Sequence, residues 1–197
     1  MDLALAPVTY AMIVANIIAS SWAFFFDRNF TGQFAFNVGA IARHKQHYRV
    51  FTSSFLHNDP MHLAFNMLAL FSFGPLVEAV LGRTGFFVVY FGAILSSGIL
   101  SFFVNRRNDQ YTSVGASDAV SGVIFAGILI SPFDELFIFP IPFAIPAWGF
   151  GFLFLGISTL LMGAENRRIA HEGHLGGALA GIALTALMLP RLVTGWF

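Results

Sequence analysis

Long apolar stretches alternate with short polar segments along the whole chain. A helix that spans a membrane needs about 20 mainly apolar residues, and six stretches of this sequence meet that requirement. They are residues 3–25, 61–80, 85–104, 114–132, 146–164 and 173–195. The pattern predicts an all-α membrane protein, a six-transmembrane-helix bundle in which residues 1–197 form a single integral membrane domain.

The polar connections differ in length and character. The first, residues 26–56, is long and mixes basic with aromatic side chains, whereas the second, residues 81–84, is a tight turn. The fourth, residues 132–146, contains Asp134, Glu135 and several prolines, which predicts a non-helical loop. No internal repeat or low-complexity linker divides the chain, so the sequence indicates one domain.

The composition indicates that a lipid bilayer is the solvent of this chain. Of its 197 residues, 57% are hydrophobic and only 10% are charged, and its mean hydropathy is +0.76. Soluble domains carry roughly 25% charged residues. The formal net charge is zero, which gives no indication of a nucleic-acid partner. The chain has no cysteine, which excludes disulfides and thiolate chemistry, and its first apolar segment lacks the basic start of a signal peptide and is expected to be retained.

Polar residues gather at the starts of the second, fourth and sixth apolar stretches. In a six-span chain these three starts lie on the same side of the membrane and at a similar depth. The second stretch contains His62 and Asn66, the fourth Ser117 and the sixth His174. Polar side chains in spanning helices are costly, about 2.5–3.5 kcal/mol for a central charge, and are therefore functional candidates. The topology is expected to bring a hydroxyl, imidazoles and an amide together.

Acyl transfer requires this combination of groups. A serine hydroxyl becomes an effective nucleophile when a neighbouring base accepts its proton, and histidine suits that role because its pKa lies near neutrality. We therefore expect Ser117 to be the nucleophile and His174 its base. His62 and Asn66 lie one turn apart on the same helix face and can donate hydrogen bonds to an oxyanion, together with the backbone N–H of Ser117.

Glycines at regular spacing indicate where helices approach each other. Gly173, Gly177 and Gly181 follow one another at four-residue intervals in the last apolar stretch. Small residues at this spacing let two membrane helices pack closely. Gly115 and Gly122 are expected to have the same role in the fourth stretch.

Three motifs together resemble those of the rhomboid intramembrane serine proteases. His57–Asn66 resembles the H-x-x-x-x-H-x-x-x-N signature of that family, Gly115–Ser117 its G-x-S motif, and His174–Gly181 its H-x-x-G-x-x-x-G helix. Tyr48–Arg49 is similar to the aromatic–arginine pair of the family's first loop. The motifs cover nearly the whole chain in the expected order.

The resemblance implies a serine endopeptidase with a catalytic dyad of Ser117 and His174, without a third acid. It implies oxyanion stabilisation by His62 and Asn66, and neither a cofactor nor a metal. It also implies that the substrates are transmembrane segments of other proteins, cleaved in or near the lipid bilayer, and that the chain is a multi-pass protein of the bacterial inner membrane.

The resemblance further implies that substrates enter past the fifth helix and the loop before it. Phe150, Phe152 and Phe154 would then be gate residues, although the same side chains suit a helix face that contacts lipid.

One residue departs from the family pattern. The family usually has glycine after the nucleophile, whereas this chain has Asp118. An acid in the first turn of a helix is favoured by the helix dipole and can cap the helix. A carboxylate beside an oxyanion site would instead oppose the developing negative charge or alter the base. The alternative function is a catalytically impaired rhomboid-like pseudoprotease that binds membrane-protein clients without cleaving them.

Other interpretations apply to individual residues. A serine in a membrane helix often bonds its own helix backbone, which is the interpretation we favour for Ser113 and Ser121. His57 is expected to be structural, bonding the first loop. A metal site is a further alternative, since four histidines lie at the helix starts, although the spacing of His171 and His174 is not that of the H-E-x-x-H motif.

The orientation in the membrane receives conflicting indications. Basic residues concentrate in the connections after the first, third and fifth helices, which places these connections in the cytoplasm by the positive-inside rule. The family expectation is the opposite orientation, with the active-site openings outside, and we favour it weakly because a loop that lies in the interface distorts the count.

Overall fold

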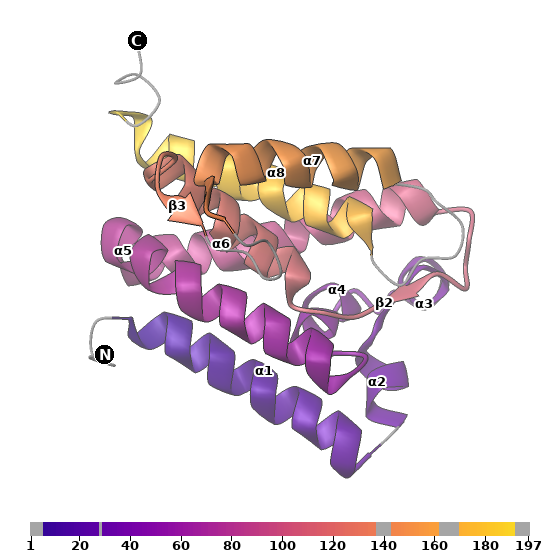
Figure 1. Ribbon diagram of the computed structural model, residues 1–197. Helices are drawn as coiled ribbons and strands as arrows, with labels where there is room; N and C mark the ends of the chain where they lie inside the picture. Colours follow the sequence, from indigo (N-terminus) through magenta and orange to yellow (C-terminus); the bar gives the residue numbers. More distant parts are fainter. Residues whose placement is uncertain (1–5, 28, 137–142, 162–169, 192–197) are drawn as a thin grey trace.

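The computed structural model describes residues 6–27, 29–136, 143–161 and 170–191. Five longer helices carry the fold: α1 (Pro7–Phe25), α5 (Pro60–Asn105), α6 (Ser117–Ile130), α7 (Ala147–Leu161) and α8 (His171–Met188). Helices α5, α6 and α8 pack against one another at the centre. In the view of Figure 1, α1 and α7 lie at opposite edges of this group.

Helix α5 covers two of the predicted apolar stretches. It begins after Asp59, whose side chain accepts a hydrogen bond from the backbone N–H of His62 at 2.8 Å, and Pro60 occupies the first turn. Gly82 interrupts it with φ 70° and ψ 172°, so two helices meet there across a kink. The tight turn predicted at residues 81–84 is thus a single non-helical residue, for which glycine suits the positive φ.

The number of membrane spans stays a prediction. Among the described residues, α1 and α5 are long and apolar enough to cross a membrane, while α6 and the segment 147–157 of α7 are shorter apolar helices. The two parts of α5 on either side of Gly82 each have the length of about 20 residues that one span requires.

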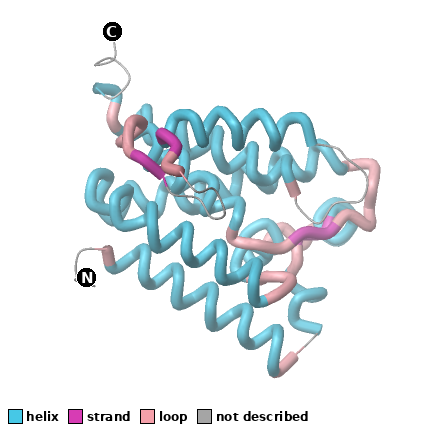
Figure 2. Tube along the Cα trace, viewed as in Figure 1, coloured by secondary structure: helices cyan, strands magenta, loops and turns pink. Residues whose placement is uncertain are grey.

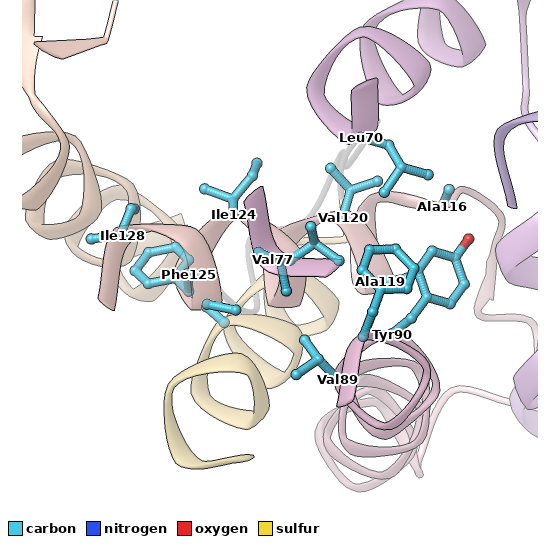
Figure 3. Close-up of a cluster of buried hydrophobic side chains, with 14 of the residues drawn as sticks. Leu70, Val77, Val89, Tyr90, Ala116, Ala119, Val120, Ile124, Phe125 and Ile128 are labelled. Carbon is cyan, nitrogen blue, oxygen red and sulfur yellow. The ribbon is translucent and has the colours of Figure 1, made fainter. Parts of the chain in front are cut away.

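Helix α6 is the central helix of the group. All of its residues from Ala119 to Ile128 are buried, as expected for a helix that is apolar on every side. Val120 and Phe125 of α6 lie in a core cluster that also contains Leu70 and Tyr90 of α5 (Figure 3). This packing places the start of α6 inside the protein.

The connection 26–56 has more regular structure than a loop. It contains the short helices α2 (Asn29–Phe34), α3 (Val38–His44) and α4 (Arg49–Thr52), the strand β1 (Phe36–Asn37) and the 3-10 helix η2 (Ser53–Phe55). The buried Arg49 side chain donates hydrogen bonds to the carbonyl oxygens of Gly32 at 3.0 Å and Ala35 at 2.8 Å. This arginine therefore holds the connection together.

Two short strand pairs modify the all-α prediction (Figure 2). Strand β1 pairs antiparallel with β2 (Thr112–Ser113), with Phe36 opposite Ser113. Strand β3 (Glu135–Leu136) pairs antiparallel with β4 (Ile145–Pro146). The first pair ties the connection 26–56 to the segment directly before α6, which explains why α6 begins at Ser117 rather than at residue 114.

Two further boundaries differ from the sequence prediction. Helix α8 extends from His171 to Met188, so it begins before residue 173 and ends well before residue 195. The described part of α1 begins at Pro7. Residues 3–5, 162–164 and 192–195 of the predicted spans lie outside the described residues.

Candidate active site

The starts of α5, α6 and α8 surround one cavity of about 790 Å³. Ser117, His174, His62 and Asn66, the four site residues predicted from the sequence, all line it. Polar residues of the loops before α5 and α6 line it as well, among them Asn58, Asp59, Thr112 and Ser113. The cavity therefore joins a hydroxyl, two imidazoles and an amide from three helices.

Ser117 is the first residue of α6. The first N–H groups of a helix have no acceptor within the helix, and among the described residues no side chain caps the start of α6 at Ala116. These N–H groups lie at the positive end of the helix dipole, next to the Ser117 hydroxyl. The start of α6 thus has free donors suited to a developing negative charge.

Gly115 leaves the space in which His62 approaches Ser117. Its φ is +143°, a conformation that residues with a side chain rarely adopt. A Cβ atom on Gly115 would lie 2.7 Å from Cε1 of His62 and 3.4 Å from Oγ of Ser117. The bare face of this glycine is therefore directed at both side chains. It does not pack against α8, the role that the sequence suggested.

His57 supports the backbone directly before the nucleophile. Its Nε2 accepts a hydrogen bond from the backbone N–H of Ala116 at 3.3 Å. A backbone N–H can only donate, so the ring proton is on Nδ1 and is donated to Oγ of Ser20 on α1 at 2.8 Å. Burial, with a smaller contribution from the neighbouring His62, lowers the pKa of His57 to about 3 against the opposing effect of Asp59.

The sequence prediction gave His57 a smaller part in the site than the structure does. We expected it to bond the first loop, and the structure connects it to α1 and to the residue before Ser117. The signal was present, since His57 opens the same motif that contains His62 and Asn66. Which backbone group it would bond was not readable from that motif.

Glycines bring α8 against α6, as the sequence predicted. A Cβ atom on Gly177 would lie 2.1 Å from the carbonyl oxygen of Asp118, and one on Gly181 would lie 2.1 Å from that of Gly122. Real Cβ atoms essentially never approach so closely. Only glycine at these positions permits the approach, which carries His174 to the cavity.

The side chains of the site adopt specific arrangements. Asn66 Nδ2 donates to the carbonyl oxygen of His62 at 3.1 Å, which leaves its second amide proton for another acceptor. The ring of His174 stacks on the ring of Phe154. Among the described residues, no hydrogen bond joins the hydroxyl of Ser117 to the ring of His174.

Asp118 faces α8 and does not act as a cap of α6. A Cβ atom on Gly173 would lie 2.5 Å from Oδ1 of Asp118, so this glycine provides the space for the carboxylate. The adjacent Glu172 is fully buried and accepts hydrogen bonds from Asn105 at 2.8 Å and Tyr111 at 2.6 Å. The acid after the nucleophile is thus directed at the interface between α6 and α8, at the edge of the cavity.

The histidines do not form a metal cluster in the described part of the chain, where no group of three or more His, Cys, Asp or Glu side chains could hold a metal ion. His57 and His62 approach each other edge to face, with ring centroids 5.0 Å apart.

Comparison with known proteins identifies relatives of this chain. It is 33% identical to the rhomboid protease GluP of Bacillus subtilis over 146 residues, which cover 73% of this chain and 27% of that protein. It is 32% identical to rhomboid protein 1, mitochondrial, of Saccharomyces cerevisiae over 66% of this chain and 38% of that protein. It is also 27% identical to the mitochondrial RHOMBOID-like protein 12 of Arabidopsis thaliana over 94% of this chain and 60% of that protein. The chain thus spans between about a quarter and three fifths of the length of these relatives.

The relatives contradict the location expected from the sequence. We expected the bacterial inner membrane, but relatives from yeast, a plant and mammals are named as mitochondrial proteins. These names assign those relatives to mitochondria, which overturns the expectation of a bacterial inner membrane. The motifs alone carry no information on the compartment, which is why the expectation was wrong.

A family-wide comparison covers most of the fold. Residues 44–191 match the family model described as Rhomboid domain. This range includes α5, α6, α7 and α8 and all the described residues that line the cavity. The chain therefore belongs to the rhomboid family.

Proposed function

We propose that this chain is an intramembrane serine endopeptidase, which hydrolyses peptide bonds in or near the transmembrane segments of membrane proteins. Ser117 is the nucleophile and His174 is the base. The observation that carries the proposal is the single cavity that Ser117 and His174 line together with His62 and Asn66. The relative named as a rhomboid protease supports the reaction class.

The reaction begins when His174 accepts the proton of the Ser117 hydroxyl. The freed oxygen attacks the carbonyl carbon of the scissile bond, and the carbonyl oxygen becomes an oxyanion. The backbone N–H groups at the start of α6, with His62 and Asn66, donate hydrogen bonds to that oxyanion. One such donor contributes about 2.7–4 kcal/mol to transition-state stabilisation in a well-studied serine protease.

Collapse of the intermediate breaks the peptide bond. The leaving amine takes its proton from His174, and the acyl group stays on Ser117 as an ester. Water then loses a proton to His174 and attacks the ester. The second collapse returns that proton to Ser117 and releases the new carboxyl end.

Two features of the site accord with this sequence of steps. Polar residues of the loops before α5 and α6 line the cavity, and we expect water to reach Ser117 past them. Catalytic hydrogen bonds are often long before substrate binds and shorten in the Michaelis complex. A Ser117–His174 hydrogen bond is therefore expected to form when substrate closes the cavity.

The test measures cleavage of a transmembrane model substrate by the purified protein in liposomes. Ser117→Ala and His174→Ala are expected to abolish cleavage while the protein stays folded. The double variant should lose little more cleavage activity than either single variant, because the two residues act as a unit. A serine-directed phosphonate should label Ser117 in the unmodified protein and nothing in Ser117→Ala.

Ser121→Ala is the matched control. Ser121 is a buried serine one turn along α6 and lines the same cavity, yet it has no assigned role in the reaction. Its substitution should leave turnover within about twofold. Unchanged cleavage by Ser117→Ala would overturn the proposal. Binding of the substrate without any cleavage by the unmodified protein would favour the pseudoprotease instead.

A further inference from the structure

The three phenylalanines of α7 have different surroundings. Phe152 is 74% exposed, and its ring contacts that of Trp148, which is also exposed. Phe154 faces the opposite way and lines the cavity. The family resemblance implied that all three phenylalanines are gate residues, with contact to lipid as the alternative. Of the three, only Phe152 is exposed as a lipid-facing side chain would be.

Phe154 lies between the two helices that carry Ser117 and His174. Its ring stacks on His174 of α8, with centroids 5.7 Å apart and planes at 26°. It also contacts the rings of Phe125 of α6 and Phe150 of its own helix, with ring centroids 5.5 Å and 5.9 Å away. Phe125 is almost completely buried, so Phe154 is held from behind while it faces the imidazole.

Among the described residues, neither ring nitrogen of His174 forms a hydrogen bond, and Phe154 is the aromatic ring that stacks on its imidazole. The ring of His171 meets the ring of His174 edge to face, with centroids 6.1 Å apart and planes at 76°. The ring stacked on His174 is thus supplied by α7.

In active sites that pair a nucleophile with a base, a third group commonly orients the base. Offset stacking against an aromatic ring restricts rotation of an imidazole about its χ2 angle. We infer that Phe154 is a positioning residue, which holds the imidazole plane of His174 toward Ser117 and so couples the position of α7 to the alignment of the base. The inference rests on the proposed function of His174.

The experiment compares kcat and KM of Phe154→Leu, Phe154→Tyr and the unmodified protein on one transmembrane substrate in liposomes. Leucine keeps an apolar side chain but removes the ring. We expect kcat to fall roughly 2- to 13-fold, the range that corresponds to one aromatic pair, with KM within about twofold. Tyrosine keeps the ring and should retain kcat. Phe152→Leu, on the same helix but facing outward, is the matched control and should keep both constants.

Three results would overturn the inference. They are an unchanged kcat in Phe154→Leu, an equal loss in Phe154→Tyr, or a rise in KM alone, which would mean that Phe154 only contacts substrate. Ring protons of His174, observed by NMR, provide a second measurement that does not need turnover.

The NMR measurement also separates the inference from the proposed function. An imidazole stacked on Phe154 should show an upfield ring-current shift that disappears in Phe154→Leu and persists in Phe152→Leu. Absence of that difference would refute the stacking even in an active enzyme. A shift that disappears as expected, in a protein that cuts no substrate and takes no phosphonate, would instead refute the protease assignment while the stacking stands.

Discussion

Gly177→Ala tests whether close packing of α6 and α8 is what aligns the site. The added methyl group would meet the carbonyl oxygen of Asp118 at 2.1 Å and its carbonyl carbon at 3.1 Å. Ordinary contacts of a Cβ atom begin near 3.4 Å, so the two helices must separate by about 1.3 Å. The opposing atoms are backbone atoms and have no rotamer that would remove the clash.

The displacement acts on both stability and catalysis. Overpacking of this kind destabilises a protein by about 1–3 kcal/mol. A misplacement of about 1 Å between reacting groups can lower a rate about 100-fold. Since Asp118 follows Ser117 and Gly177 lies one turn after His174, we expect kcat/KM of Gly177→Ala to fall by about that factor.

The assay combines cleavage of a transmembrane substrate with thermal unfolding in the same detergent. Gly156→Ala on α7 is the control, because nothing lies within 4 Å of the Cβ atom that it would add. In a helix alanine is favoured over glycine by about 1 kcal/mol, so the control should be neutral or slightly stabilised. Wild-type activity and Tm in Gly177→Ala, or an equal loss in Gly156→Ala, would refute the reasoning.

Three further predictions concern the supports of the site. Gly115→Ala forces a side chain into a φ of +143° and to within 2.7 Å of His62, so we expect a loss of about 1–3 kcal/mol in unfolding free energy and a large fall in turnover. The pKa of His57 is about 3 in the folded state and near 6.5 in the unfolded state, so between these pH values the unfolded chain binds a proton that the folded chain does not. Thermal stability should therefore decline as pH falls from about 6.5 toward 3, and it should decline less in His57→Gln. Glu78 is buried and accepts hydrogen bonds from the backbone N–H and hydroxyl of Thr9 at 2.7 and 2.8 Å, so Glu78→Gln should cost about 1.5–3 kcal/mol in unfolding experiments.

Each of these three variants has a matched control variant elsewhere in the chain. Gly32→Ala adds a Cβ atom with nothing within 4 Å, and His44→Gln and Glu135→Gln change exposed side chains. All three should keep the stability and the pH profile of the unmodified protein. The reasoning fails for any pair whose two members behave alike.

The apolar pattern predicted most of the helices, because each stretch of about 20 apolar residues has few alternatives to a helix in a bilayer. It did not predict the short helices of the connection 26–56 or the pairing of β1 with β2. Those elements depend on partners distant in sequence, such as Phe36 opposite Ser113 and the carbonyl groups that Arg49 binds.

The residues of the site were readable from local motifs, whereas their supports were not. Ser117, His174, His62 and Asn66 stand out because polar groups are rare in apolar stretches. The stacking of Phe154 on His174 involves a residue type that occurs 25 times in the chain. Nothing in the local pattern distinguishes Phe154 from Phe152, since the difference is the direction in which each faces.

The order of apolar and polar residues was enough to indicate a helical membrane protein and four side chains that meet in one cavity, because these follow from spacing along the chain and from the energy of polar groups in lipid. The family was indicated by the resemblance of three motifs to those of rhomboid proteases. The tertiary structure decided which atoms those side chains approach. Three of these contacts join distant segments of the chain. His57 bonds the residue before Ser117, Gly177 admits a backbone carbonyl of α6, and Phe154 of α7 stacks on His174. Such contacts depend on how closely whole helices pack, and this is a property of their combined surfaces that no single segment contains.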